Sequence, residues 1–227
     1  MFELLKKYEF YKICIIIYYF PIIFEGDFMA YIILFSVIAY FTGSINPSIL
    51  ISKKIYGKDI RKLESKNAGA TNMMRAFGKR AGLLVFLLDF SKGILSVFIA
   101  KAAVIFLDAP YEAALFAGFF AVLGHIFPVF FRFKCGKGVA TLAGAAFALM
   151  PVITLILLIL FAVIVSLTNI VSLASGICAA VFPIAAYFFA RNHNNELFIF
   201  GCCCAALMII KHLPYCQYAC SGRRGRI

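Results

Sequence analysis

Residues 81–107 read AGLLVFLLDFSKGILSVFIAKAAVIFL, an apolar run interrupted by only three ionisable side chains. About 20 helical residues cross the hydrocarbon core of a bilayer, so this run is long enough to span it. The whole chain of 227 residues is 64% hydrophobic and 14% charged, with a mean hydropathy of +0.97. Further apolar runs cover Met29–Ser52, Tyr111–Phe131, Thr141–Leu167, Gly176–Ala190 and Leu197–Ile210. This pattern predicts an all-α fold, a polytopic integral membrane helical bundle.

The positive charge is concentrated in one connector. Nine of the 22 Lys and Arg residues lie between Lys53 and Arg80, opposed there only by Asp59 and Glu64. Cytoplasmic loops of membrane proteins carry such an excess of basic residues. The net charge of +12 would also suit nucleic acid, but its concentration beside membrane spans favours orientation and contact with anionic lipid. We therefore place this connector in the cytoplasm and expect no nucleic-acid partner.

The other polar segments predict the path of the chain. The run Tyr111–Phe131 leads to a basic segment that includes Lys137, so it returns to the side of the first connector. An even number of crossings must follow if the basic tail lies on that side too. We therefore expect Thr141–Leu167 to fold back near Pro151 as two shorter helices, because proline interrupts a helix. This gives about seven membrane helices after residue 28 and brings Thr168–Ser172 to the cytoplasmic face.

The first 28 residues are predicted to be an N-terminal extension. A short apolar run, Ile13–Phe24, contains Pro21 and is followed by no small-residue cleavage site. An additional hydrophobic segment, or a start assigned upstream of Met29, is therefore favoured over a signal peptide. Residues 29–227 are expected to form a single membrane domain.

The eight cysteines form no C-x-x-C pair, and most lie in or beside apolar runs. There a free thiol behaves as a small apolar side chain. We expect neither a disulfide framework nor a metal site.

The basic connector contains the richest polar segment of the chain, Ser65–Arg75. Within eleven residues it supplies hydroxyls, carboxamides, a glycine and a guanidinium. Hydroxyls and amides donate hydrogen bonds to phosphate oxygens, and a guanidinium binds them in pairs. This inventory suits a phosphate-holding loop.

A second polar segment, Gly136-Lys137-Gly138, stands directly before an apolar helix. It can present backbone N–H groups and an ammonium to an anion, although it lacks the Walker spacing. His125, shortly before it, is expected to be an interfacial histidine with its hydrogen bonds satisfied rather than a base. Asp89 and Lys92 are spaced i, i+3 inside an apolar span, which predicts an ion pair bordering the site.

Taken together, these motifs resemble the acyl-phosphate:glycerol-3-phosphate acyltransferase family. The resemblance covers roughly residues 29–212 in consistent order. Its motifs are Gly43-Ser-Ile, Asp59-Ile-Arg61, Ser65-Lys-Asn67 through Asn72 and Arg75, Leu88-Asp-Phe-Ser-Lys-Gly93, Gly124-His with Phe127-Pro, Gly136-Lys-Gly-Val-Ala-Thr141 and Val171-Ser-Leu. Members of that family are bacterial inner-membrane enzymes with seven helices and cytoplasmic motifs. The resemblance implies the same arrangement here, with the active site facing the cytoplasm.

The resemblance also implies the site residues. Ser65 and Arg75 match the essential residues of the first motif, and His212 matches the histidine of the third. The expected substrate-binding residues are Asn67, Gly69, Thr71, Asn72, Gly136, Lys137, Gly138 and Ser172. Three family positions differ, with Tyr215 in place of asparagine, Arg223 or Arg224 in place of glutamate, and Asn169 in place of arginine.

The implied reaction transfers a fatty acyl group from acyl phosphate to the 1-hydroxyl of glycerol 3-phosphate, giving lysophosphatidic acid for phospholipid synthesis. It needs no cofactor. Its implied partners are the two substrates, membrane lipid and the enzyme that produces acyl phosphate. Three alternatives stay open: a catalytically impaired family member, a membrane carrier of a small organic anion, and an acyltransferase with another donor. None of the three histidines begins the His-x4-Asp motif of the usual acyl-CoA enzymes.

Overall fold

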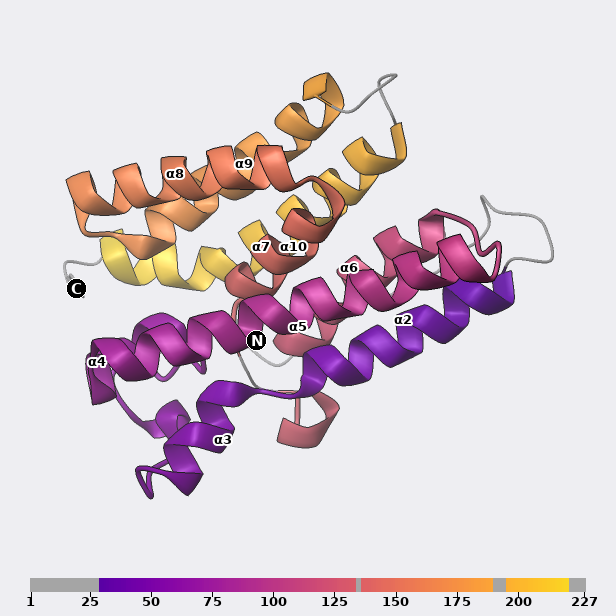
Figure 1. Cartoon of the computed structure of the whole chain (residues 1–227). Helices are drawn as coiled ribbons and strands as arrows, with labels where there is room; N and C mark the ends of the chain where they lie inside the picture. The colour runs from indigo at the N-terminus through magenta and orange to yellow at the C-terminus, as the bar shows by residue number, and fades with distance from the viewer. Residues whose placement is uncertain (1–28, 134–135, 190–194, 221–227) are drawn as a thin grey trace, which may run out of the picture.

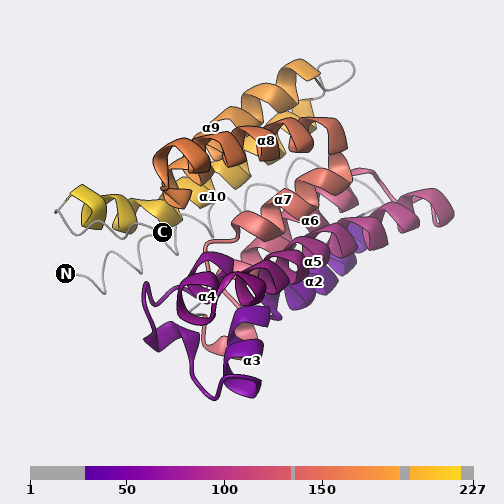
Figure 2. The same ribbon diagram turned by 60° about the vertical axis from the view of Figure 1, so that its left-hand side comes forward.

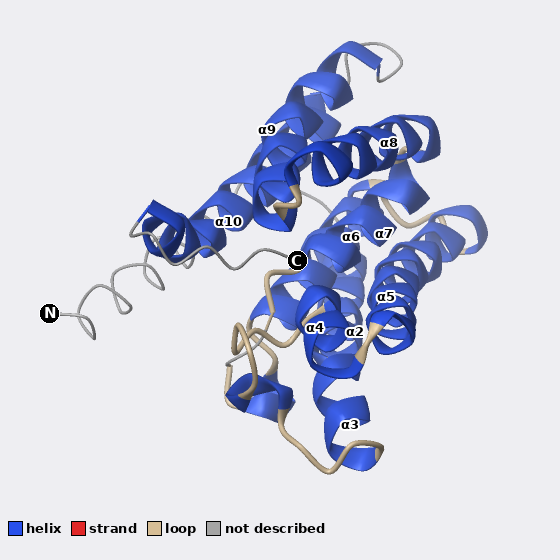
Figure 3. Cartoon of the chain, turned by 90° about the vertical axis from the view of Figure 1, so that its left-hand side faces the viewer, coloured by secondary structure: helices blue, strands red, loops and turns tan. Residues whose placement is uncertain are grey.

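The computed structural model describes residues 29–133, 136–189 and 195–220, with the backbone alone for Phe189 and residues 212–220. Within these ranges every regular element is a helix, which confirms the predicted all-α class (Figure 3). The α-helices are α2 (Met29–Ser44), α3 (Pro47–Lys54), α4 (Ala70–Phe77), α5 (Lys79–Phe106), α6 (Glu112–Ile126), α7 (Val139–Leu149), α8 (Pro151–Thr168), α9 (Val171–Phe189) and α10 (Asn195–Cys220). Two short 3-10 helices, η2 (Ile60–Lys62) and η3 (Val129–Phe131), lie in the polar connectors.

Five helical segments are long and apolar enough to cross a membrane: Met29–Lys54, Lys79–Phe106, Glu112–Phe131, Pro151–Thr168 and Val171–Phe188. The helix α7 is shorter but equally apolar. By length and composition these helices fit the predicted integral membrane bundle, while the count of about seven crossings stays a prediction.

The expected span Met29–Ser52 consists of two helices, α2 and α3, separated at Ile45 and Asn46. Pro47 is the first residue of α3, and proline disfavours helical backbone at the residue before it. The Asn46 side chain accepts a hydrogen bond from Ile49 N at 3.0 Å and so caps the new helix. This break leaves the carbonyl group of Ile45 outside the helical hydrogen-bond ladder, where a side chain can reach it.

The predicted division of Thr141–Leu167 is confirmed. The helix α7 ends at Leu149, and Pro151 is the first residue of α8. Asn169 then takes a left-handed conformation between α8 and α9, and Ser172 lies in the first turn of α9. The α9 helix begins at Val171 and so includes the flank expected before the apolar run Gly176–Ala190.

The helices form two groups (Figure 1). In the first, α5 packs against α2, α6 and α7, and α6 packs against α2. In the second, α9 lies between α8 and α10, and α7 joins the groups by packing against both α5 and α8. The short helices α3 and α4 lie together at one end of the first group (Figure 2). The polar connector that contains α3 and α4 therefore lies at one end of the bundle.

Two helix pairs approach closely through reciprocal glycines. A Cβ atom on Gly93 of α5 would overlap Thr141 O of α7, and one on Gly144 of α7 would overlap Phe90 O of α5. Gly43 and Gly124 lie in the same way against Ala121 O and Tyr40 O, which joins α2 to α6. Small residues allow this backbone contact, and the resulting packing drives helix association within lipid.

The substitution Gly144→Ala should destabilise the bundle, because its methyl group has no space beside Phe90 O. Overpacking of this kind costs about 1–3 kcal/mol, measurable as a lower midpoint of thermal unfolding in detergent. The matched control is Gly176→Ala in α9, where a Cβ atom meets nothing within 4 Å. It should keep or slightly raise the midpoint, since alanine favours a helix. Equal midpoints for both variants would contradict the close contact.

Candidate active site

The first predicted loop is organised by Asn72, which is only 1% exposed in the first turn of α4. Its Nδ2 donates to Ile60 O at 3.2 Å and to Leu63 O at 3.1 Å. Its Oδ1 accepts from Ser65 N at 3.1 Å. Both amide hydrogens are thus committed to the loop itself. The structure gives Asn72 the position of a loop organiser, and its expected contact with substrate stays a prediction.

The same loop is anchored by Asp59 and Arg61. Asp59 Oδ1 accepts from Arg61 N at 3.0 Å and caps η2, while the guanidinium of Arg61 pairs with both carboxylate oxygens. Hydrogen bonds from this guanidinium hold the pKa of the Asp59 carboxyl well below its usual range. Arg61 Nη1 also donates to Phe131 O at 3.4 Å. The first loop is therefore tied to η3, which leads into the second.

The other predicted residues of the first motif belong to this same unit. Gly69 precedes the first residue of α4 as its N-cap, and Arg75 stands in the last turn of that helix. Ser65, Asn67 and Thr71 are half-buried around the helix start. The loop and α4 therefore carry hydroxyl, amide and cationic groups on one continuous segment.

The second predicted loop, Gly136–Gly138, requires its glycines. Gly138 caps α7 with a φ of +82°, in the left-handed region that favours glycine. A Cβ atom on Gly136 would overlap His125 Nε2 and lie 2.7 Å from Ala68 O. The second loop therefore contacts the first at Gly136 and Ala68, two segments that are far apart in sequence.

Lys137 and Ser172 were both expected to bind substrate, and the structure brings them together. Lys137 Nζ donates to Ser172 Oγ at 3.1 Å. Because Ser172 lies in the first turn of α9, this bond joins the second helix group to the glycine loop. An ammonium and a hydroxyl side by side can both donate to one phosphate group.

The predicted pair of Asp89 and Lys92 is confirmed, with Lys92 Nζ 2.8 Å from Asp89 Oδ1. Two further contacts of Lys92 could not be predicted from the sequence spacing. Its Nζ lies 2.9 Å from Nδ1 of His125, and it donates to Ile45 O at 2.7 Å. The expectation of a histidine with partners is met, since His125 Nδ1 contacts Lys92 and Asp89, and the ring is in addition buried at 3% exposure.

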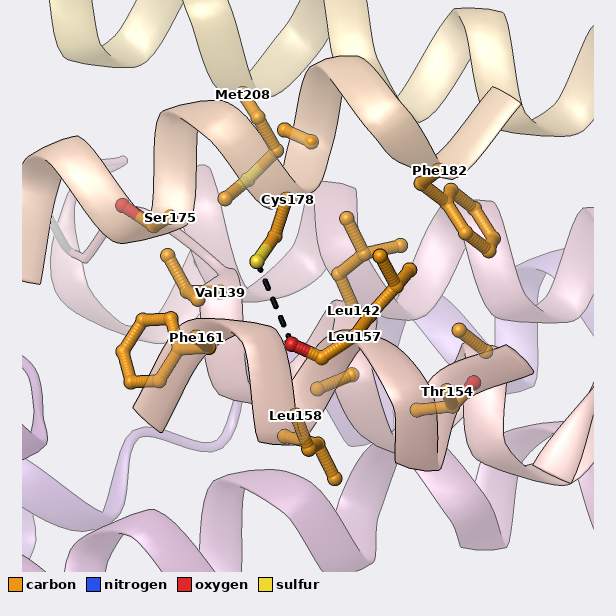
Figure 4. Close-up of a pocket in the computed structure, with 13 residues that line it drawn as sticks. Val139, Leu142, Thr154, Leu157, Leu158, Phe161, Ser175, Cys178, Phe182 and Met208 are labelled. Carbon is orange, nitrogen blue, oxygen red and sulfur yellow. Dashed lines mark hydrogen bonds between the residues drawn. The ribbon is translucent and has the colours of Figure 1, made fainter. Parts of the chain in front are cut away.

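An apolar pocket begins immediately after the second loop (Figure 4). Its walls come from α7, α8, α9 and α10 and include Val139, Leu142, Leu158, Phe161, Phe182 and Met208. The hydroxyls of Thr154 and Ser175 donate to Met150 O and Ser172 O, and the Cys178 thiol donates to Leu157 O, so the polar groups of the wall are hydrogen-bonded within the protein. The pocket is therefore apolar throughout, a suitable surface for a hydrocarbon.

Two predictions fall outside the described residues. The backbone of α10 includes residue 212, but the side chain of His212 is among those not described. The proposed N-terminal extension, residues 1–28, is also outside the described ranges.

Among the residues that are described, no group of three or more His, Cys, Asp or Glu side chains is placed to hold a metal ion.

Comparisons with known proteins identify the class. The crystal structure of PlsY (YgiH), an integral membrane glycerol 3-phosphate acyltransferase, in its glycerol 3-phosphate form matches with a TM-score of 0.77 and 36% identity. The match covers 86% of this chain and 95% of that one. The lysphosphatidic acid form of PlsY matches with a TM-score of 0.73 and 34% identity over the same shares. The fold is thus that of a membrane-embedded acyltransferase.

Sequence comparisons agree with the structural match. The family model described as glycerol-3-phosphate acyltransferase matches residues 33–222. The glycerol-3-phosphate acyltransferase of Fusobacterium nucleatum is 36% identical over 192 residues, covering 85% of this chain and 96% of that protein. The glycerol-3-phosphate acyltransferase of Finegoldia magna is 45% identical over 145 residues, covering 64% of this chain and 71% of that protein. The chain belongs to the glycerol-3-phosphate acyltransferase family, which confirms the resemblance seen in its motifs.

The substitution Asn72→Ala should loosen the first loop, because Ser65 N, Ile60 O and Leu63 O lose their partner. With each hydrogen bond contributing about 1 kcal/mol, local opening should increase at least about tenfold. Limited trypsin digestion measures this as faster cleavage after Lys62 and Lys66, which are exposed. Thr71→Ala is the control, since Thr71 makes none of these bonds. Unchanged cleavage in Asn72→Ala would show that other contacts shape the loop.

Proposed function

We propose that this enzyme transfers a fatty acyl group from acyl phosphate to the 1-hydroxyl of glycerol 3-phosphate, at the cytoplasmic face of a bacterial inner membrane. The contact between Gly136 and Ala68 carries the proposal, because it brings two loops suited to phosphate against each other. Each substrate carries one phosphate. Two adjoining phosphate sites are what a reaction between these substrates requires.

We assign the binding of glycerol 3-phosphate to the second loop and the start of α9, through Gly136, Lys137, Gly138 and Ser172. The Lys137 ammonium and the Ser172 hydroxyl already lie within hydrogen-bond distance, so the phosphate would find two donors in place. Backbone N–H groups at the start of α7 add further donors, and the helix dipole favours an anion there.

Ser65 and Arg75 are assigned to the acyl phosphate, with Asn67, Gly69 and Thr71 lining the same loop. An arginine fork binds two phosphate oxygens at once and thereby fixes the orientation of the group. The acyl chain would follow the apolar pocket that begins at Val139 and continue between the helices into lipid. The donor would thus be held at both its polar and its apolar end.

The chemistry needs no covalent enzyme intermediate, because an acyl phosphate is already activated. The 1-hydroxyl oxygen attacks the carbonyl carbon, the bond from that carbon to the phosphate oxygen breaks, and lysophosphatidic acid and inorganic phosphate leave. The hydroxyl proton passes to a substrate phosphate or to His212. Holding the two reactants in attack geometry can supply about 7–11 kcal/mol of the barrier reduction.

The purified protein in detergent, given labelled glycerol 3-phosphate, should form lysophosphatidic acid with palmitoyl phosphate and not with palmitoyl-CoA. Thin-layer separation of the labelled lipid measures the product. Product from palmitoyl-CoA alone would overturn the proposed donor. A folded protein that forms no product from either donor would instead indicate an impaired family member.

The substitution Arg75→Lys should reduce acyl transfer from acyl phosphate at least about tenfold, or about 1.4 kcal/mol, because lysine offers a point charge in place of the fork. Initial rates at varied acyl phosphate measure the loss. Arg80→Lys is the matched control, since Arg80 is an exposed arginine of the same connector. Near-normal turnover in Arg75→Lys would remove Arg75 from the donor site.

A further inference from the structure

Three ionisable side chains form a buried cluster beneath the two loops. Asp89, Lys92 and His125 are 1%, 8% and 3% exposed, respectively. Lys92 Nζ lies 2.8 Å from Asp89 Oδ1 and 2.9 Å from His125 Nδ1. His125 Nδ1 is in turn 3.2 Å from Asp89 Oδ1. The mechanism above uses none of these three groups, so their presence in an apolar bundle needs an explanation.

One side of the cluster contacts the support of the first loop. Lys92 Nζ donates to Ile45 O at 2.7 Å, at the break between α2 and α3. The next residue, Asn46, donates through Nδ2 to Ala68 O at 3.4 Å. The ammonium of Lys92 therefore fixes the backbone segment that in turn holds Ala68.

The other side of the cluster contacts the second loop. The Nε2 edge of the His125 ring occupies the space where a side chain on Gly136 would lie, and Ala68 O borders the same space. The contacts thus form a closed ring that runs from Lys92 through Ile45, Asn46, Ala68 and Gly136 to His125 and back. A shift of any member changes the separation of the two loops.

Stability alone is a weak reason for this cluster. Burying an ion pair costs desolvation, and well-packed apolar side chains of similar volume are often as stable or more so. What apolar side chains cannot supply is direction: hydrogen bonds hold Ile45 O and the His125 ring at fixed distances and angles. The benefit of the cluster is therefore geometric.

We propose that Asp89, Lys92 and His125 are positioning residues that set the separation of the two substrate loops, and hence the distance between the acyl carbonyl and the attacking hydroxyl. This inference rests on the proposed acyl transfer. A misplacement of about 1 Å can cost about 10²-fold in rate. Each loop keeps its own binding groups when the cluster is removed, so the loss should appear in kcat rather than in either KM.

The test removes both charges together, in Asp89→Leu/Lys92→Met, so that neither is left buried without its partner. The variant should remain folded, with kcat reduced about 10²-fold and both KM values close to those of the unmodified protein. The control Ser96→Ala removes a buried hydroxyl one turn further along α5, which bonds only the carbonyl of Lys92 in its own helix. It should leave kcat and both KM values unchanged.

A second variant, His125→Asn, tests the contact with Gly136 separately. Asparagine can place a polar atom near the position of Nδ1 but lacks the ring edge that lies against the second loop. It should lower kcat while the unfolding midpoint stays near that of the unmodified protein. If the double variant does not fold, this variant alone decides the matter.

The outcomes separate the two proposals. An unmodified protein that transfers no acyl group from acyl phosphate overturns both. An active unmodified protein with full kcat in a folded double variant, or in His125→Asn, overturns the positioning role and leaves acyl transfer standing. A lower unfolding midpoint with unchanged kcat per folded molecule would likewise assign the cluster to stability alone.

Discussion

The ammonium of Lys92 is the group on which the arrangement of this end of the bundle depends. A buried charge must be paired and hydrogen-bonded, or it costs several kcal/mol. Here the partners come from three places: Asp89 of the same helix, His125 of α6 and the carbonyl of Ile45. The carbonyl group of Ile45 can accept this bond because α2 ends before it. The break before Pro47 therefore supplies one of the partners that the buried ammonium of Lys92 needs.

Reciprocal glycines provide the second constraint. The backbones of α5 and α7 touch at Gly93 and Gly144, and those of α2 and α6 touch at Gly43 and Gly124. These contacts fix four helices at short separations without using large side chains. The polar loops at one end are therefore carried by a rigid support, which is what a site that aligns two substrates requires.

Sequence patterns predicted the features that depend on local chemistry. Run length identified long apolar helices, Pro151 marked the break between α7 and α8, and i, i+3 spacing predicted the Asp89–Lys92 pair. Contacts between distant segments left no such signal. The role of Asn72 depends on backbone carbonyls, which every residue has. Likewise, the sequence positions of His125 and Gly136 do not show that the imidazole ring lies where any side chain at position 136 would have to be.

The hydrogen bonds of the first loop have a consequence for biosynthesis. The Asn72 side chain bonds Ile60, Leu63 and Ser65, and Arg61 donates to Phe131 O. The side-chain bonds of Asn72 therefore need none of the later helices, and they can form before α7 to α10 are synthesised in full. The bond from Lys137 to Ser172 forms only after α8 has been inserted. The order of synthesis therefore allows the first loop to form before this bond joins the two helix groups.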